Sequence, residues 1–200
     1  MTKRRFLEWG GIIAGAVLIV FGVVAIAMGV NANSTVKDNL KAEQIYFKDA
    51  ATDPTVPKEY SGQLVDNGAK ARAFATMMRG HTLKATSGKT YSQMGRFQAK
   101  DGKGSDGIGG TNDEKAAATD PTTKQPISNQ ARNIWVTETA LGTALNVSYM
   151  AGQLALFGLV VGVALLLTGI GLVILAVMAL GVVPATRKVT VSAPTPAVGH

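Results

Sequence analysis

Few side chains in this sequence could carry a catalytic reaction. The 200 residues include no cysteine and only two histidines, His81 and His200. A zinc or non-haem iron site normally needs at least two His or Cys ligands beside carboxylates, and a Ser-His-Asp triad would have to be built on His81. A lone histidine on an Ala-rich helix more often packs in an interface. We therefore expect no catalytic residue, no metal, no cofactor and no enzyme.

A Gly-rich tract contains two patterns that resemble ligand sites. "GKGSDG" at 102–107 matches the dinucleotide fingerprint, but that motif works only between a strand and a helix that receives the pyrophosphate, and neither is expected here. Asp101, Ser105, Asp106 and Asp113 could touch Ca²⁺ transiently, but their spacing is not that of an EF-hand loop. The favoured interpretation is a solvated, flexible loop at 100–126.

The rest of the chain is organised by two uncharged apolar blocks, which are Trp9 to Val30 and Leu154 to Val183. Both exceed the roughly 18 residues that indicate a membrane span, and backbone groups in hydrocarbon must be satisfied within the segment, which requires helices. The first block, preceded by three basic residues, could instead be a cleaved signal peptide. The apolar core of a signal is only about 7–15 residues, so we expect a retained anchor.

The charges that flank the two blocks predict the topology. Three basic residues against one acid precede the first block, and Arg187 and Lys188 follow the second. Basic residues concentrate on the cytoplasmic side, so both termini are expected in the cytoplasm and the middle of the chain outside. The expected divisions are a cytoplasmic N-terminus (1–8), a first span (9–30), an extracytoplasmic domain (31–138), a long helix (139–183) whose part at about 154–183 is the second span, and a cytoplasmic tail (184–200).

The predicted outer domain is polar and poor in core residues. Between Asn31 and Glu138 there are 15 basic and 12 acidic residues, a net charge of +3, and 13% Leu, Ile, Val and Phe. The interleaved charges argue against nucleic-acid binding. One amphipathic helix is expected between Asp66 and Gly88, with Phe74, Met77, Met78 and His81 on one face. The expected fold is a mainly α membrane protein with two transmembrane helices and a small, mostly helical domain.

The second apolar block belongs to a longer uncharged stretch whose surplus length needs an explanation. No charge occurs in the 48 residues from Thr139 to Thr186, although about 20 helical residues cross a bilayer. A second helix is expected to begin near an N-cap at Ser128 or Asn129 and to continue into the span. Its outer part, with Trp135 and Tyr149, would then stand above the bilayer as a dry surface.

Small residues in the spans and aromatic residues above them are the candidate interface residues. Gly11 with Gly15, and Gly158 with Gly162, form GxxxG patterns, which let helix backbones approach closely. We expect these glycines to pair the spans with each other or with partner helices. Trp135 and Tyr149 offer large rigid contact area, as interface anchors usually do.

Several short motifs together resemble a group of uncharacterised two-pass membrane proteins of actinobacteria. They are "KAEQIYF", "GQLVDNGAKARAFA", "HTLK" and "GKTYSQ", placed between a basic N-terminal anchor and a long second span. The Gly-rich tract from Asp101 to Pro126 departs from the shorter linker of that group. The resemblance implies a cell-envelope location and no established activity. Many members carry the label "aromatic ring-opening dioxygenase", but one internal histidine cannot supply the His/His/carboxylate iron site.

These observations predict a non-catalytic accessory subunit of a larger protein complex in the plasma (inner) membrane. Its partners would be integral membrane subunits and the lipid bilayer, and it would dock through its spans and the outer extension of the second helix. A second hypothesis is a membrane-anchored ligand-binding or sensing module, in which Phe74, Met77, Trp135 and Tyr149 line a small groove. A third alternative leaves the outer helix covered by the chain's own Phe74, Met77 and Met78 face.

Overall fold

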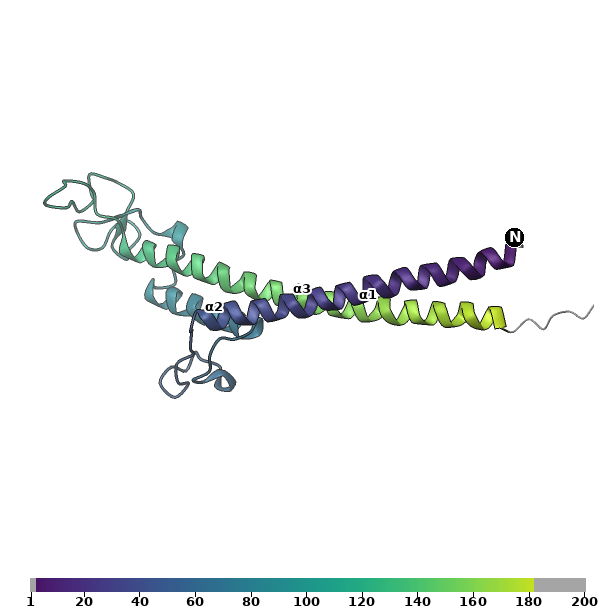
Figure 1. Cartoon of the computed structure of the whole chain (residues 1–200). Coiled ribbons are helices and arrows are strands. Elements are labelled where there is room, and N and C mark those ends of the chain that lie inside the picture. The colour runs from purple at the N-terminus through teal and green to yellow at the C-terminus, as the bar shows by residue number, and fades with distance from the viewer. Residues whose placement is uncertain (1–2, 182–200) are drawn as a thin grey trace, which may run out of the picture. The chain divides into compact units, whose positions relative to one another are not determined.

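The computed structural model describes residues 3–181, and within them the protein is mainly helical (Figure 1). The elements are α1 (Lys3–Ala42), η1 (Lys58–Tyr60), α2 (Gly68–Ala85), η2 (Tyr91–Gln93), β1 (Phe97–Gln98), β2 (Gly110–Thr111) and α3 (Gln130–Gly181). Both α1 and α3 are long and apolar enough to cross a membrane. The chain forms two units, Met1–Ala25 with Val161–His200, and Ile26–Val160.

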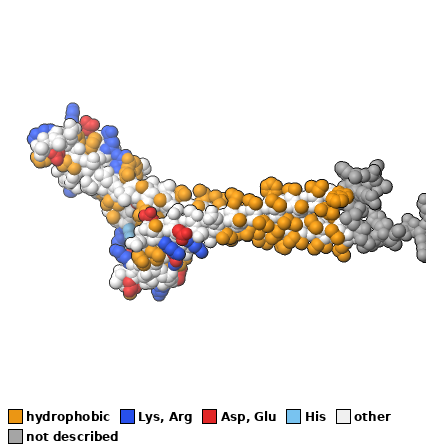
Figure 2. Space-filling model, in the orientation of Figure 1, with side chains coloured by type: hydrophobic (Ala, Val, Ile, Leu, Met, Phe, Trp, Pro, Cys, Tyr) orange, Lys and Arg blue, Asp and Glu red, His pale blue; other side chains and the backbone are white. Residues whose placement is uncertain are grey.

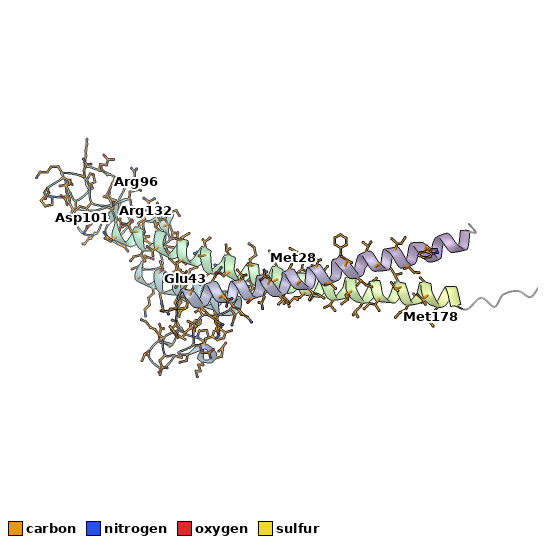
Figure 3. The ribbon with its side chains drawn as sticks, in the orientation of Figure 1. Met28, Glu43, Arg96, Asp101, Arg132 and Met178 are labelled. Atoms are coloured by element: carbon orange, nitrogen blue, oxygen red, sulfur yellow. The ribbon has the colours of Figure 1, made fainter. Side chains whose placement is uncertain are left out.

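The first unit is a pair of helices that bury almost only small residues. Over the side chains that the structure describes, the buried positions are Gly15 and Gly22 in α1 and Gly162, Gly169 and Ala176 in α3. These positions recur every seven residues, or about two helical turns, so each helix buries one narrow stripe. Hydrophobic side chains cover the visible outer face of the pair (Figure 2), and Met178 is 59% exposed (Figure 3). This exposure is typical of helices whose solvent is lipid.

The second unit has a compact apolar core around α2. Phe47, a residue between α1 and α2, lies at its centre, with ring centroids 5.3 Å from Phe74 and 5.4 Å from Tyr60. The buried members come from all three helices and from the segment before α2: Leu40, Phe47, Val56, Val65, Ala71, Ala75, Met77 and Leu145. Phe74, Met77 and Met78 of α2 pack in this core together with Leu145 of α3. The chain's own apolar face therefore covers part of α3, in agreement with the third alternative.

Local capping sets the ends of α2 and confirms the helix expected between Asp66 and Gly88. The Asn67 side chain accepts a hydrogen bond from the Lys70 backbone N–H at 3.0 Å, which satisfies a donor that the first turn leaves free. At the other end Gly88, with φ +77°, donates its N–H to the Leu83 carbonyl at 2.7 Å. The left-handed residue directly after the C-cap is Ser87, with φ +52°, and it donates its N–H to the Lys84 carbonyl at 3.3 Å. These two hydrogen bonds close the helix as a Schellman motif.

The long helices extend further into the second unit than the expected domain boundaries. The expected first span covers 9–30, and the helix α1 continues beyond it to Ala42. The helix α3 begins at Gln130, as the predicted N-caps at Ser128 and Asn129 imply, and so includes the end of the range 31–138 assigned to the outer domain. The Asn129 side chain accepts from the Ala131 N–H at 3.0 Å, which confirms one of the two predicted N-caps. The expected helix end at 183 and the tail at 184–200 lie outside the described residues.

Asp106 organises the Gly-rich segment between α2 and α3. Its carboxylate accepts backbone N–H groups of Gly95 at 2.9 Å, Ile108 at 3.0 Å and Gly110 at 2.7 Å. Burial acts to raise the pKa of Asp106, but these three donors outweigh it and the pKa lies below its usual value. The carboxylate thus joins residues far apart in the segment, beside the antiparallel β1–β2 pair.

Further aspartates make turns in the same segment. Asp101 accepts from the N–H groups of Lys103 and Gly104, and Asp120 from those of Thr122 and Thr123. Hydrogen bonds of this kind replace the apolar core that the composition lacks. The expected loop at 100–126 therefore consists of hydrogen-bonded turns on either side of the short strand β2, and its flexibility stays a prediction.

Candidate functional site

Three of the four predicted span glycines lie at the contact between α1 and α3 in the first unit. A Cβ placed on Gly11 would lie 3.3 Å from the Cβ of Ala176, and one on Gly15 would lie 2.7 Å from the carbonyl oxygen of Gly169. Residues later in α1 therefore meet residues earlier in α3, so the helices are antiparallel. No side chain larger than hydrogen fits at Gly15 without moving the backbone.

Gly162 is buried in the same contact, whereas Gly158, the other glycine of its GxxxG pattern, is less buried. The carbonyl oxygen of Gly162 lies 2.8 Å from the Cβ position of Gly22, so Gly162 faces the chain's own α1. Gly158 is half-buried. The glycines thus pair the spans with each other, which was one of the two outcomes expected from the GxxxG patterns.

A repeat of seven describes the fully buried positions of this contact. We call the buried stripe formed by Gly15, Gly22, Gly162, Gly169 and Ala176 the glycine seam. The spacing from Gly15 to Gly22 to Gly29 and from Gly162 to Gly169 is visible in the sequence. The GxxxG patterns and the further glycines Gly22, Gly29 and Gly169 favour association of the spans, but the four-residue spacing does not reveal this seven-residue period. A small residue at every second turn keeps one stripe facing an antiparallel neighbour along the helix.

In the second unit, Gly29 and Ala155 show where both helices change from apolar to polar. A Cβ on Gly29 would lie 2.8 Å from the Ala155 carbonyl oxygen. The apolar block of α1 ends at Val30, and that of α3 begins at Leu154. The two changes therefore lie at the same level, which we call the polarity boundary. A pair of helices that enters a bilayer together must show this coincidence.

Trp135 is not available as a surface anchor. Its side chain is 3% exposed, and its indole N–H donates to the Lys89 carbonyl at 2.9 Å and to the Thr86 hydroxyl at 3.3 Å. The Arg79 guanidinium lies 5.1 Å from the ring centroid. The prediction that Trp135 contacts a partner is wrong, because the turn after α2 folds over it and satisfies its N–H.

Tyr149 remains partly accessible. The Arg72 guanidinium lies 4.8 Å above its ring centroid, a cation–π contact between α2 and α3. The close approach of the two helices depends on Gly68, where a Cβ would lie 2.9 Å from the Tyr149 Cα. Tyr149 is thus held from one side and faces a hollow on the other.

An exposed apolar stripe follows α3 on a face that neither α1 nor α2 covers. It comprises the apolar residues Val136, Ala140, Val147, Met150, Leu154 and Phe157 with the polar Thr143 between them, all exposed. Their spacing alternates four and three residues, as in the contact stripe of a coiled coil. Val136, Val147 and Met150 are 55%, 51% and 56% exposed. We call this set the α3 stripe, and it crosses the polarity boundary.

His81 has polar neighbours but not the arrangement of a catalytic triad. Its Nε2 lies 2.7 Å from the Thr55 hydroxyl and 3.2 Å from an Asp53 oxygen. In a triad the nucleophile and the carboxylate contact different ring nitrogens, whereas here both contact the same one. Hydrogen bonds from Thr55, and to a smaller extent His81, lower the pKa of Asp53. Among the described residues, no group of three or more His, Asp or Glu side chains is placed to hold a metal.

The four side chains of the second hypothesis do not share a groove. Phe74 packs against Phe47, and Met77 lines an open hollow with Thr55 and Arg72. Trp135 lies under the turn after α2, and Tyr149 faces a different hollow. The predicted groove is therefore wrong, because these residues point from α2 and α3 into separate contacts.

No protein family model, curated protein or solved structure matches this chain. The resemblance to two-pass membrane proteins of actinobacteria stays a prediction.

Proposed function

We propose that this protein is a non-catalytic accessory subunit of a larger membrane complex, and that the α3 stripe is its docking surface. The observation that carries the proposal is the exposure of a coiled-coil-like apolar stripe on the water side of the polarity boundary. Isolated exposed apolar residues are ordinary on protein surfaces, but a continuous row at coiled-coil spacing is typical of a helix that packs against another helix.

The part of the partner that packs against the α3 stripe is an apolar face of a helix. The stripe runs from Val136 to Phe157 and so continues past the polarity boundary, which favours a partner helix that itself leaves the bilayer. From Thr139 onward its flanking residues are uncharged. Charged flanks usually select coiled-coil partners, so close apolar packing has to select this one. Such a helix belongs to an integral membrane protein, in a plasma membrane with both termini of this chain in the cytoplasm.

Site-specific photo-crosslinking tests the docking surface. A photo-reactive residue at Val147 should give one adduct of defined mass with a membrane protein in native membranes. The same residue at Thr137, exposed on another face of α3, serves as the matched control and should give little of that adduct. Val147→Asp should remove the stoichiometric partner on mild detergent extraction, whereas Thr137→Asp should retain it. An equal yield from both positions would refute the proposal.

A ligand-binding or sensing module is the second candidate, favoured by one hollow. Thr55, Arg72, Thr76 and Met77 line an open hollow of about 470 Å³ beside α2, which is within the size range of small-molecule sites. Native mass spectrometry separates the candidates. A co-purifying small molecule lost in Arg72→Ala would favour this second function, and a stoichiometric protein partner would favour the first.

A further inference from the structure

A second hollow in the second unit lies where α1, the start of α2 and α3 meet. It measures about 230 Å³, and its lining includes Asn33, Asn67, Tyr149, Gln153, Leu156 and Leu159. Sites for whole drug-sized ligands usually enclose about 300–1,000 Å³. The hollow therefore suits a head group or a short piece of chain rather than an entire amphiphile.

The lining divides into a polar end and an apolar end. Asn33 in α1 and Gln153 in α3 stand on the polar side of the polarity boundary, whereas Leu156 and Leu159 stand on its apolar side. When the two helices cross a bilayer, this hollow opens at the level where lipid head groups meet acyl chains. A ligand that fits both ends must itself be amphipathic.

The polar end offers amide and phenol groups rather than charges. Each primary amide has two N–H donors and a carbonyl acceptor, and Asn67 uses only part of this capacity within the chain, accepting from Lys70 N–H and donating to Asp66. The charges of Lys70 and Asp66 pair with each other at 3.0 Å. The Tyr149 ring is held by Arg72. Groups of this kind recognise hydroxyls, which both donate and accept hydrogen bonds.

We propose that this hollow binds one membrane lipid whose head group carries hydroxyls, either the glycerol of phosphatidylglycerol or the sugar of a glycosyl diacylglycerol. The head-group hydroxyls bind Asn33, Asn67, Gln153 and Tyr149, and an acyl chain leaves along Leu156 and Leu159. The inference rests on the proposed membrane placement and needs no protein partner. Its failure would therefore leave the test of the α3 stripe unchanged.

Gly152 offers a direct way to close the hollow. It belongs to the lining, and a Cβ there would meet no atom within 4 Å, so the side chain of Gly152→Phe starts in open space at the hollow. Gly171, on the same helix, also has open space at its Cβ position, and Gly171→Phe is the matched control. Tyr149→Phe removes only the hydroxyl and keeps the ring beneath Arg72.

The experiment is native mass spectrometry of the full chain, delipidated in mild detergent and titrated separately with three lipids. These are phosphatidylglycerol, a glucosyl diacylglycerol and phosphatidylcholine, whose head group has no hydroxyl. The wild type and Gly171→Phe should retain one molecule of at least one hydroxyl-bearing lipid and at least tenfold less phosphatidylcholine. Gly152→Phe should lose that retention, and Tyr149→Phe should lose most of the discrimination. The hydroxyl-bearing lipid that is retained shows whether the bound head group is a glycerol or a sugar.

Two results would overturn the proposal. One is equal retention of all three lipids by the wild type, and the other is unchanged retention in Gly152→Phe. Circular dichroism of both phenylalanine variants, which should match the wild type, shows that a loss of binding comes from the filled hollow. If Gly152→Phe and Gly171→Phe lost the lipid together, the site would also be refuted.

Discussion

Replacing Gly169 by leucine is expected to separate α1 from α3, whereas the same change two residues away at Gly171 is not. A Cβ on Gly169 would lie 2.6 Å from the Gly15 carbonyl oxygen and 2.8 Å from the Ile19 backbone nitrogen, where ordinary contact begins near 3.4 Å. The helices must therefore move apart by roughly 0.8 Å for the first carbon alone. At Gly171 the added carbon meets no atom within 4 Å.

The energetic cost follows from overpacking at a backbone contact. Forcing extra carbons into a close-packed site typically costs about 1–3 kcal/mol. Since about 1.4 kcal/mol is a factor of ten in an equilibrium constant, pairing of the spans should weaken by roughly 5- to 100-fold or more.

A cysteine pair reports this change directly. The chain has no cysteine of its own, and the Cβ positions of Gly11 and Ala176 are 3.3 Å apart, close to the roughly 3.5–4.5 Å of a disulfide. Gly11→Cys with Ala176→Cys should form a disulfide readily in oxidised membranes. Cleavage at a protease site inserted beside Ser105 would then leave two fragments joined until they are reduced.

The initial rate of this cross-link should fall at least about fivefold in the Gly169→Leu background and stay within about twofold of the parent in Gly171→Leu. Leucine is favourable within a bilayer, so both variants should insert equally. Equal cross-linking rates in the two backgrounds would refute the glycine seam as the contact that pairs the spans.

Three further predictions concern the second unit and the topology. Trp135→Phe should lower the free energy of unfolding by about 1–2 kcal/mol in denaturant titrations, because the Lys89 carbonyl loses its indole donor; Trp135→Ala should cost about 3–5 kcal/mol. Asp106→Ala should speed amide exchange at its three donors about tenfold or more. Because the folded pKa of Asp106 lies below its usual value near 3.8, its stabilisation is present above about pH 4 and is lost as pH falls through the folded pKa, so amide exchange in the wild type should accelerate there. Cysteines at Ser105 and Ser192 test orientation, since an impermeant thiol reagent on whole cells should label only the first.

Local sequence signals were sufficient to predict the helices. The uncharged blocks predict α1 and α3, and the Ala-rich composition with Phe74, Met77, Met78 and His81 on one face predicts α2. Their length in the second unit was harder to predict, because Asn31 to Ala42 is polar and has weak helix propensity. That segment is helical because Val36 and Leu40 pack on the core of the second unit, a long-range contact that no local pattern encodes.

The interface residues were predictable only in part. The glycines were recognised as close-packing residues, and three of them do pack between the helices. Trp135 was assigned to the wrong surface because its cover comes from Thr86 and Lys89, which are distant in sequence. The α3 stripe was within reach of the sequence, since its four-three spacing is local, but separating it from the covered face required knowledge of where α1 and α2 lie.

The carboxylate-bonded turns around Asp106 have a thermodynamic consequence. Burial of apolar surface is what makes the heat capacity rise on unfolding, and exposure of polar groups lowers it. Because this segment is held by backbone-to-carboxylate hydrogen bonds, its local opening carries a small heat-capacity change. Its stability should then decline almost linearly with temperature, without the curvature that produces cold denaturation in the apolar core around Phe47.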